Sequence, residues 1–316
     1  MRAEKRVRIR KRQIRRRRAA RLLKGIAAAA ILVFLLPKAA GFASALGKGI
    51  FSLFASPSAS VENGTAAAGN LTAGSIPAGQ APVLPQGGVD AQILEHLRET
   101  WKDNPEAAPI LEHPEEYPDA LLELLSKRPE TLSFVLHYPS QKNEKQTIDL
   151  SGETTQGTLP LLYQWDERWG YGRYGDSIVA LSGCGPTCLS MVLIGLTGDV
   201  SLHPQAVAVF SEENGYRTEG GTAWDLMTLG AAKLGITGEE LPLDEGRMTE
   251  ALRQGHPIIC SMRPGDFTDT GHFIVLVGYE DGAFLVHDPN SVENSRASWT
   301  YEQIHGQIKN LWAYSL

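Results

Sequence analysis

Cysteine is scarce in this chain of 316 residues, which has three, at Cys184, Cys188 and Cys260. An odd number leaves at least one thiol free and argues against a fold held together by disulfides. Cys188 is most simply a residue of a helix core, and Cys260 a buried strand residue. Cys184 is the cysteine whose sequence surroundings indicate a chemical role.

Acidic residues are almost absent from residues 1–24, where Glu4 stands against 13 Lys and Arg. This basic tail has a net charge of +12 and leaves 17 basic against 35 acidic residues in the rest of the chain. It also lacks the interleaved aromatic side chains on which nucleic-acid bases stack. We therefore expect no nucleic-acid partner, and interpret residues 1–24 as a cytoplasmic tail beside a membrane.

Charge is absent from Gly25–Leu36, and residues 25–47 are interpreted as a single membrane segment or a signal. The uninterrupted run is shorter than the ~20 residues of a spanning helix, so spanning requires that Lys38 snorkels and that the helix tolerates Pro37. The rival interpretation is a cleaved signal, because Ala43-Ser44-Ala45 has the form of a processing site. A third alternative is a buried core helix beside a nucleic-acid-binding tail.

The first two interpretations both export the remainder of the chain. We expect a single-pass cell-membrane protein with an extracellular catalytic domain, or a secreted protein if the signal is cleaved. Residues 48–89 are expected to be a flexible linker, since Pro57 to Gly88 has almost no charge or large apolar side chains and cannot form a core.

Helical periodicity dominates the next part of the chain. Residues 90–158 are predicted to be a small helical subdomain packed onto the main domain at residues 159–316, because alone it is too short to supply much core. Helical patterns cover 90–102, 118–127 and 132–138, and later 204–214, 222–234 and 248–254, whereas 258–262 has a β-rich composition.

The stretch from Ser182 to Leu189 places Cys184 between two glycines directly before a helix. Pro186 suits the first turn of that helix, and Gly198 ends it. At the positive end of a helix, backbone N–H groups and the dipole favour thiolate over thiol, as a nucleophile requires. The flanking glycines let backbone or a substrate carbonyl approach the sulfur.

A candidate base, His272, opens an apolar, β-branched run typical of a central strand. The next strand ends at Asp288. If the two strands form a hairpin around residues 278–282, a loop of five or three residues puts both side chains on one face, whereas an even loop separates them unless a bulge intervenes. Cys184, His272 and Asp288 would then form a nucleophile, a base and an orienting group, with Asn290 as the second candidate for the last role.

These residues resemble a family, the papain-like cysteine peptidases related to the bacteriocin-processing (double-glycine leader) peptidases, in its stand-alone, often exported bacterial branch. The resemblance runs from about Leu159 to Leu316. It depends on four motifs in this order, namely Tyr163-Gln164-Trp165-Asp166 with Trp169-Gly170, Gly183-Cys184-Gly185-Pro186-Thr187, Gly271-His272-Phe273 and Asp288-Pro289.

The resemblance implies an α+β, papain-like fold, in which a helix carrying the cysteine packs against an antiparallel sheet carrying the histidine and aspartate. It also implies roles: Cys184 as nucleophile, His272 as general base and acid, Asp288 as orienting group, and Gln164 as oxyanion donor with the backbone N–H of Cys184. The sequence differs from transporter-linked leader peptidases in carrying no transporter half and in a longer separation between Gln164 and Cys184.

We therefore expect an exported, membrane-tethered thiol hydrolase that cleaves peptide or isopeptide bonds in a peptide or protein substrate without a cofactor. An acyl transferase or amidase would use the same three groups, and a non-catalytic peptide-binding module is a further alternative. A structural zinc site at Cys184, Cys188 and His272 is a more distant one, because no fourth ligand is evident.

The interpretation of residues 25–47 can be tested by topology. Protease added to intact cells should release a soluble fragment that begins between residues 57 and 88. Protection of the whole domain would contradict export. A mature protein that starts at Leu46 would keep export but replace the membrane anchor with a cleaved signal.

Overall fold

The computed structural model describes residues 82–316, which belong to one compact unit. The predicted tail (1–24), the membrane segment or signal (25–47) and most of the linker (48–89) lie outside the described residues. None of the helices within 82–316 has the length and apolar character needed to cross a membrane.

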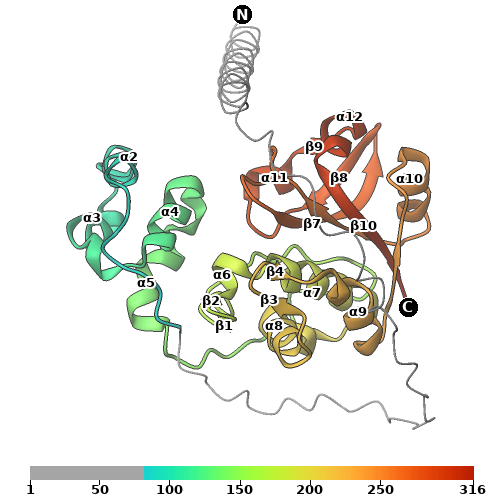
Figure 1. Ribbon diagram of the computed structural model, residues 1–316, viewed down its shortest axis with the longest axis horizontal. Coiled ribbons are helices and arrows are strands. Elements are labelled where there is room, and N and C mark those ends of the chain that lie inside the picture. Colours follow the sequence, from blue (N-terminus) through green and yellow to red (C-terminus); the bar gives the residue numbers. More distant parts are fainter. Residues whose placement is uncertain (1–81) are drawn as a thin grey trace, which may run out of the picture. The chain divides into compact units, whose positions relative to one another are not determined.

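The first part of the described chain is helical, as its periodicity predicts (Figure 1). Asp90 caps the first helix by accepting the Gln92 N–H, and a proline opens each of the three short 3-10 helices that separate the longer ones. The elements are α2 (Ala91–Trp101), Pro105–Ala107, α3 (Ala108–Glu112), Pro114–Glu116, α4 (Asp119–Lys127), Pro129–Thr131 and α5 (Leu132–Gln141).

The helical segment, residues 91–141, builds its core partly from residues of the later chain. Leu97, Leu121 and Leu125 are buried in one hydrophobic cluster. The same cluster contains Tyr171 and Ile178, both from beyond the segment. Helices this short bury enough apolar surface only by sharing a core.

A six-stranded antiparallel sheet forms the centre of the second part, with the strand order β5-β10-β6-β7-β8-β9. All five residues of β6 are buried, in agreement with the β-rich composition there. The strands are β5 (Thr237–Glu240), β6 (Ile258–Met262), β7 (His272–Glu280), β8 (Ala283–His287), β9 (Ser298–Trp299) and β10 (Ile308–Ser315). Two small ladders pair β1 (Arg173–Tyr174) with β2 (Ser177–Ile178) and β3 (Arg217–Thr218) with β4 (Gly221–Thr222).

Alternate residues of the central strands enter two different cores. Phe273 and Val275 pack with α7 (Cys184–Thr197), whereas Ile274 and Leu276 pack with α10 (Glu245–Arg253) and α12 (Tyr301–Ile304). This period of two is that of a strand covered on both faces. The remaining helices are α6 (Val179–Ser182), α8 (Pro204–Glu213), α9 (Leu229–Lys233) and α11 (Val292–Arg296), with 3-10 helices at Val200–Leu202, Trp224–Met227 and His305–Gln307.

The helix predicted over residues 222–234 is wrong as a single element. The chain forms a 3-10 helix over Trp224–Met227, leaves helical geometry at Thr228 (φ −118°, ψ −75°) and resumes as α9. Gly230 lies so close to Leu226 that an added Cβ would be 2.8 Å from that side chain. The periodicity of the apolar residues reveals neither this close packing nor the break at Thr228.

The β7–β8 hairpin also differs from the predicted loop of three or five residues. Its turn is Asp281-Gly282, both with positive φ (50° and 79°), as in the two-residue turns that suit hairpins. The pairing register then shifts between Leu276 and Gly278, which leaves Val277 as a bulge. Continued by one residue, the shifted register puts Asp288 opposite Ile274, on the same face as His272 and diagonal to it. With a two-residue turn alone, His272 and Asp288 would lie on opposite faces of the sheet. The bulge at Val277 returns them to the same face.

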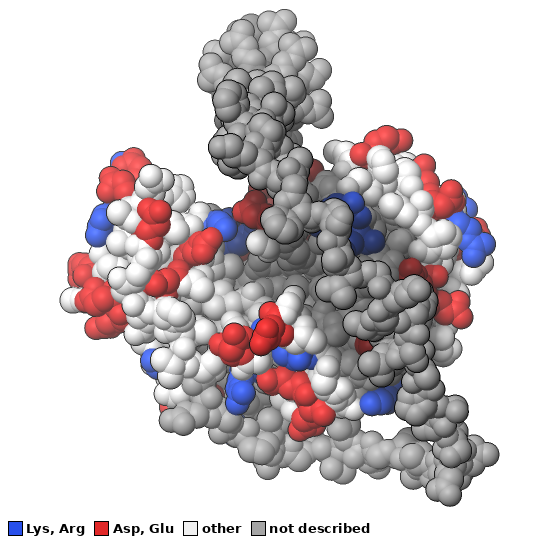
Figure 2. Space-filling view, viewed as in Figure 1, with Lys and Arg blue, Asp and Glu red and all other residues white. Residues whose placement is uncertain are grey.

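Acidic side chains are more abundant than basic ones on the face drawn in Figure 2 and are spread over it in several groups. This agrees with the excess of acidic residues after residue 24.

The close packing of β5 gives a stability prediction. A Cβ at Gly238 would lie 2.2 Å from the carbonyl oxygen of Met227 and 2.8 Å from the ring of Tyr314, its partner in the ladder. Gly238→Ala should therefore lower the free energy of unfolding by about 1–3 kcal/mol, measured by urea denaturation.

Gly246→Ala is the matched control, since a Cβ there would meet only Asp244 Oδ1 at 3.3 Å, on an exposed turn of α10. Its stability should equal or slightly exceed that of the wild type. Equal unfolding midpoints for both variants would contradict the packing of β5.

Candidate active site

Cys184 is the first residue of α7, a helix of 14 residues that ends where Gly198 adopts a left-handed conformation (φ 76°). Cys184 is half-buried, whereas Gly185 to Gly195 are buried. The helix start therefore places Cys184 at the edge of the core in which the rest of the helix is anchored.

The two glycines beside Cys184 serve close packing. A Cβ at Gly183 would be 2.6 Å from the carbonyl oxygen of Val179, and one at Gly185 would be 2.8 Å from the Thr222 side chain. From the sequence, these glycines are expected to let a substrate carbonyl approach the sulfur. In the structure both positions are instead crowded by the protein itself, so any larger residue would displace α6 or the β3–β4 hairpin from the start of α7.

His272 and Asp288 form a buried pair next to this helix start. Their residues are 7% and 0% exposed, and the imidazole Nε2–H donates to Asp288 Oδ1 at 2.8 Å. Burial opposes a positive charge on His272, but the carboxylate of Asp288 and the hydrogen bonds of the ring raise its pKa to about 10. Since Nε2 is taken, Nδ1 is the nitrogen left to face the thiol.

The thiol of Cys184 responds to this imidazole. Burial disfavours the thiolate, but the hydrogen bond from His272 and its positive charge outweigh burial, so the pKa of Cys184 is lowered from its ordinary value. A lowered cysteine pKa beside a raised histidine pKa is the pattern of a thiolate–imidazolium pair. Such a pair exists between the two pKa values and is lost when the pH falls below the pKa of the thiol or rises above that of the imidazole.

Asp288 is held by groups that the sequence analysis missed. Its Oδ2 accepts the Asn294 side-chain N–H at 2.7 Å, and its backbone N–H donates to the Ser295 hydroxyl at 2.9 Å. Both residues belong to α11, which Ser291 caps by accepting the Asn294 N–H. A capping serine directly after Asp-Pro-Asn was the available signal that a helix turns back over the aspartate.

Asn290, the second candidate for the orienting role, contacts Asp288 through its backbone. Its N–H donates to Asp288 Oδ1 at 2.8 Å, while its side-chain Oδ1 is buried without a hydrogen-bond partner among residues 82–316. The carboxylate of Asp288 thus accepts three hydrogen bonds, from His272, Asn290 and Asn294, which lower its pKa against the effect of burial. The structure places Asp288, and not Asn290, against the imidazole.

Gln164 lies between the two halves of the candidate site. Its backbone N–H donates to the carbonyl of Pro289 at 2.8 Å, and its side-chain Nε2 donates to the carbonyl of Ala180 at 2.6 Å, one helical turn before Cys184. The residue is 3% exposed. One amide N–H fixes the side chain, and the second N–H of the same nitrogen is free to bind another acceptor.

Cys188 and Cys260 are both fully buried, and burial raises the pKa of each thiol well above its ordinary value. Within residues 82–316 no group of three or more His, Cys, Asp and Glu side chains could hold a metal ion, so Cys184, Cys188 and His272 do not form the alternative zinc site.

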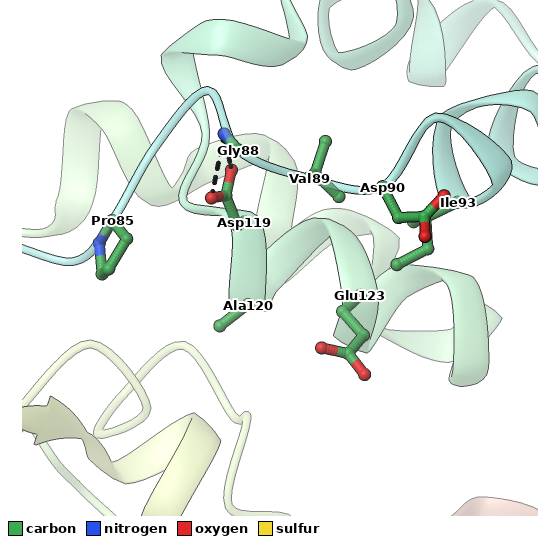
Figure 3. A pocket seen from close by; sticks show the side chains of 8 residues that line it. All are labelled: Pro85, Gly88, Val89, Asp90, Ile93, Asp119, Ala120 and Glu123. Carbon is green, nitrogen blue, oxygen red and sulfur yellow. Dashed lines mark hydrogen bonds between the residues drawn. The ribbon is translucent and has the colours of Figure 1, made fainter.

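A hollow between the start of the described chain and the helices α2 and α4 is lined by none of these residues (Figure 3). Three carboxylates line it, and each already has a partner: Asp90 caps Gln92, Asp119 accepts the Gly88 N–H at 3.0 and 3.1 Å, and Glu123 pairs with Lys127 at 2.7 Å. Of the three, Asp119 holds the start of the described chain against α4, whereas Asp90 and Glu123 bond within their own helices.

The family comparison gives one match, over residues 157–315, to the model of the Peptidase_C39 like family. A search of the curated proteins gives no match. Among solved structures, the chain is similar to a C39-like peptidase from Bacillus anthracis (16% identity, 51% of this chain and 96% of that chain, TM-score 0.35). It is also similar to the peptidase domain of Streptococcus ComA, a bifunctional ABC transporter involved in quorum sensing (16% identity, 42% and 90%, TM-score 0.30).

The environments of the three thiols predict their reactivity. Because the pKa is lowered at Cys184 and raised at Cys188 and Cys260, iodoacetamide at about pH 7 should label Cys184 first. His272→Ala removes the group that lowers the pKa of Cys184 and leaves the effect of burial, which raises it. Labelling of Cys184 should therefore slow at least about tenfold. Peptide mass spectrometry measures each rate, and equal labelling of all three thiols in the folded protein would contradict the assignment.

Proposed function

Because the chain belongs to the Peptidase_C39 like family, a family of cysteine peptidases, we propose that it hydrolyses peptide or isopeptide bonds through Cys184, His272 and Asp288. The observation that carries this proposal is the 2.8 Å bond from His272 Nε2 to Asp288 Oδ1, combined with the lowering of the Cys184 pKa by His272. The proposal includes a papain-like fold, which the packing of the cysteine helix against the antiparallel strands supports.

In the first step, the Cys184 thiolate attacks the carbonyl carbon of the scissile bond. The His272 imidazolium gives its proton to the leaving amine as the C–N bond breaks, and a thioester to Cys184 remains. Neutral His272 then takes a proton from water, whose oxygen attacks the thioester and releases the carboxylate product. Asp288 keeps the imidazole in one tautomer and orientation throughout.

The oxyanion of each tetrahedral intermediate would be stabilised by two donors. One is the Cys184 backbone N–H, since the first N–H groups of a helix have no intrahelical acceptor. The other is the second N–H of Gln164 Nε2, whose first N–H is fixed by Ala180. Removing one such donor typically lowers turnover ~10²–10³-fold.

Export and attachment to a membrane remain a proposal based on the apolar run at residues 25–36. They would place the hydrolase outside the cell, on a linker, with peptides or proteins of that compartment as substrates. An acyl transfer to an amine in place of water would use the same residues.

Mutation of Cys184, His272 and Asp288 can distinguish an enzyme from a peptide-binding module, because in an enzyme the three side chains act together. Once the thiol is gone, His272 has no proton to take, so Cys184→Ala and His272→Ala should each lower turnover of a cleaved peptide about as far as the double mutant. Asp288→Asn should lower turnover with the fold retained, because it favours the wrong histidine tautomer.

The controls are far-UV circular dichroism for the fold and mass spectrometry for a covalent adduct on Cys184. A binding module would keep its affinity in Cys184→Ala and form no adduct with any substrate-like electrophile. If wild type offered varied peptide libraries gives no cleavage, no transfer and no adduct, the enzymatic proposal is refuted.

A further inference from the structure

The helical segment, residues 91–141, contacts the chain at several places where the candidate catalytic residues are held. Its buried cluster includes Ala180, whose carbonyl fixes Gln164 and which lies one turn before Cys184. The carbonyl of Phe134 accepts the Tyr171 hydroxyl at 3.0 Å, and the two rings stack at 4.3 Å. The segment is therefore packed against the region that leads into α7.

A second contact reaches the segment that holds Asp288. Glu130, in the 3-10 helix before α5, accepts the backbone N–H of Val292, the first residue of α11, at 3.2 Å. Since the first N–H groups of a helix lack internal acceptors, Glu130 and Ser291 together satisfy two of them. The carboxylate thus fixes the end of α11 from which Asn294 extends to Asp288.

Other polar contacts of the helical segment are weaker anchors. Lys127 lies 3.7 Å from Asp269 in the loop before β7, and His137 lies 3.0 Å from Glu167, but all four side chains are well exposed. Exposed ion pairs contribute little to stability or position. Glu130, which is partly buried, is the better candidate for a positioning role.

The charged and ionisable groups around Asp288 are few. The half-buried Tyr163 has its hydroxyl near Ser295 and lies within electrostatic reach of Arg296, Glu130 and Asp288. Its partial burial is the main cause that raises its pKa, so the hydroxyl is neutral at physiological pH. His272 is therefore the group whose charge depends most directly on where the carboxylate of Asp288 points.

We propose that Glu130 and Asn294 are positioning residues of the active site, which makes the helical segment a working part of the peptidase. Glu130 holds the start of α11, Asn294 holds Oδ2 of Asp288, and Oδ1 is thereby kept at hydrogen-bonding distance from the imidazole that activates Cys184. This inference rests on the proposed function, because it assigns a role within the same site.

The test is the pH profile of Cys184 alkylation by iodoacetamide in the purified full chain, with each cysteine followed by mass spectrometry. If Asp288 turns away from His272, the imidazole pKa falls and the thiol pKa rises. Glu130→Ala and Asn294→Ala should therefore shift the profile to higher pH and slow labelling about tenfold near pH 6. Glu130→Gln retains an acceptor oxygen and should keep the wild-type profile.

Glu116→Ala is the matched control, an exposed glutamate of the helical segment whose carboxylate has no hydrogen bond within the described part of the chain. It should leave the profile unchanged. The buried Cys188 and Cys260 report on the fold, and they should stay unlabelled in every variant. With a cleaved peptide, kcat should fall in the two alanine variants while KM stays constant.

Two results would overturn the inference: a wild-type profile in Glu130→Ala and Asn294→Ala, or slower labelling of Cys184 accompanied by labelling of Cys188 and Cys260, which would mean general loosening. Failure of the proposed function looks different. There the wild-type thiol is activated and responds to both substitutions, yet no peptide is cleaved and no acyl adduct forms.

Discussion

The buried hydrogen bond between His272 and Asp288 is the interaction on which the rest of the candidate site depends. Removing two charged groups from water costs several kcal/mol per ion unless hydrogen bonds replace the lost hydration. Asp288 meets this requirement with three donors, from His272, Asn290 and Asn294. The β7–β8 hairpin, the turn after it and α11 are the structure needed to bring those donors to one carboxylate.

The three cysteines show how strongly position decides chemistry. Cys184 and Cys188 lie one turn apart on the same helix, yet the pKa of the first is lowered by His272 while burial raises that of the second. Burial also raises the pKa of Cys260, inside β6. In the proposed mechanism Cys184 is the nucleophile because it lies at a helix start beside the imidazole that lowers its pKa.

Much of this could be predicted from local sequence signals. Proline, glycine and apolar spacing predicted α7, and the β-branched run after His272 predicted a central strand. Contacts between distant segments could not be predicted, which is why Glu130 was missed. Asn294, six residues from Asp288, was missed although the capping Ser291 was a local signal for α11. The bond from Gln164 to Ala180 links residues whose proximity only the packed chain reveals.

The hairpin that carries the histidine and the aspartate combines an even turn, Asp281-Gly282, with one bulged residue, Val277. Both side chains share a face only because these two features cancel. A residue inserted in the turn would leave the strand pairs of β7 and β8, and therefore both faces, unchanged. A residue inserted within β7 or β8 would reverse the face of His272 or Asp288 unless a bulge were gained or lost at the same time. Related hairpins should therefore vary in length at the turn and keep the length of the two strands.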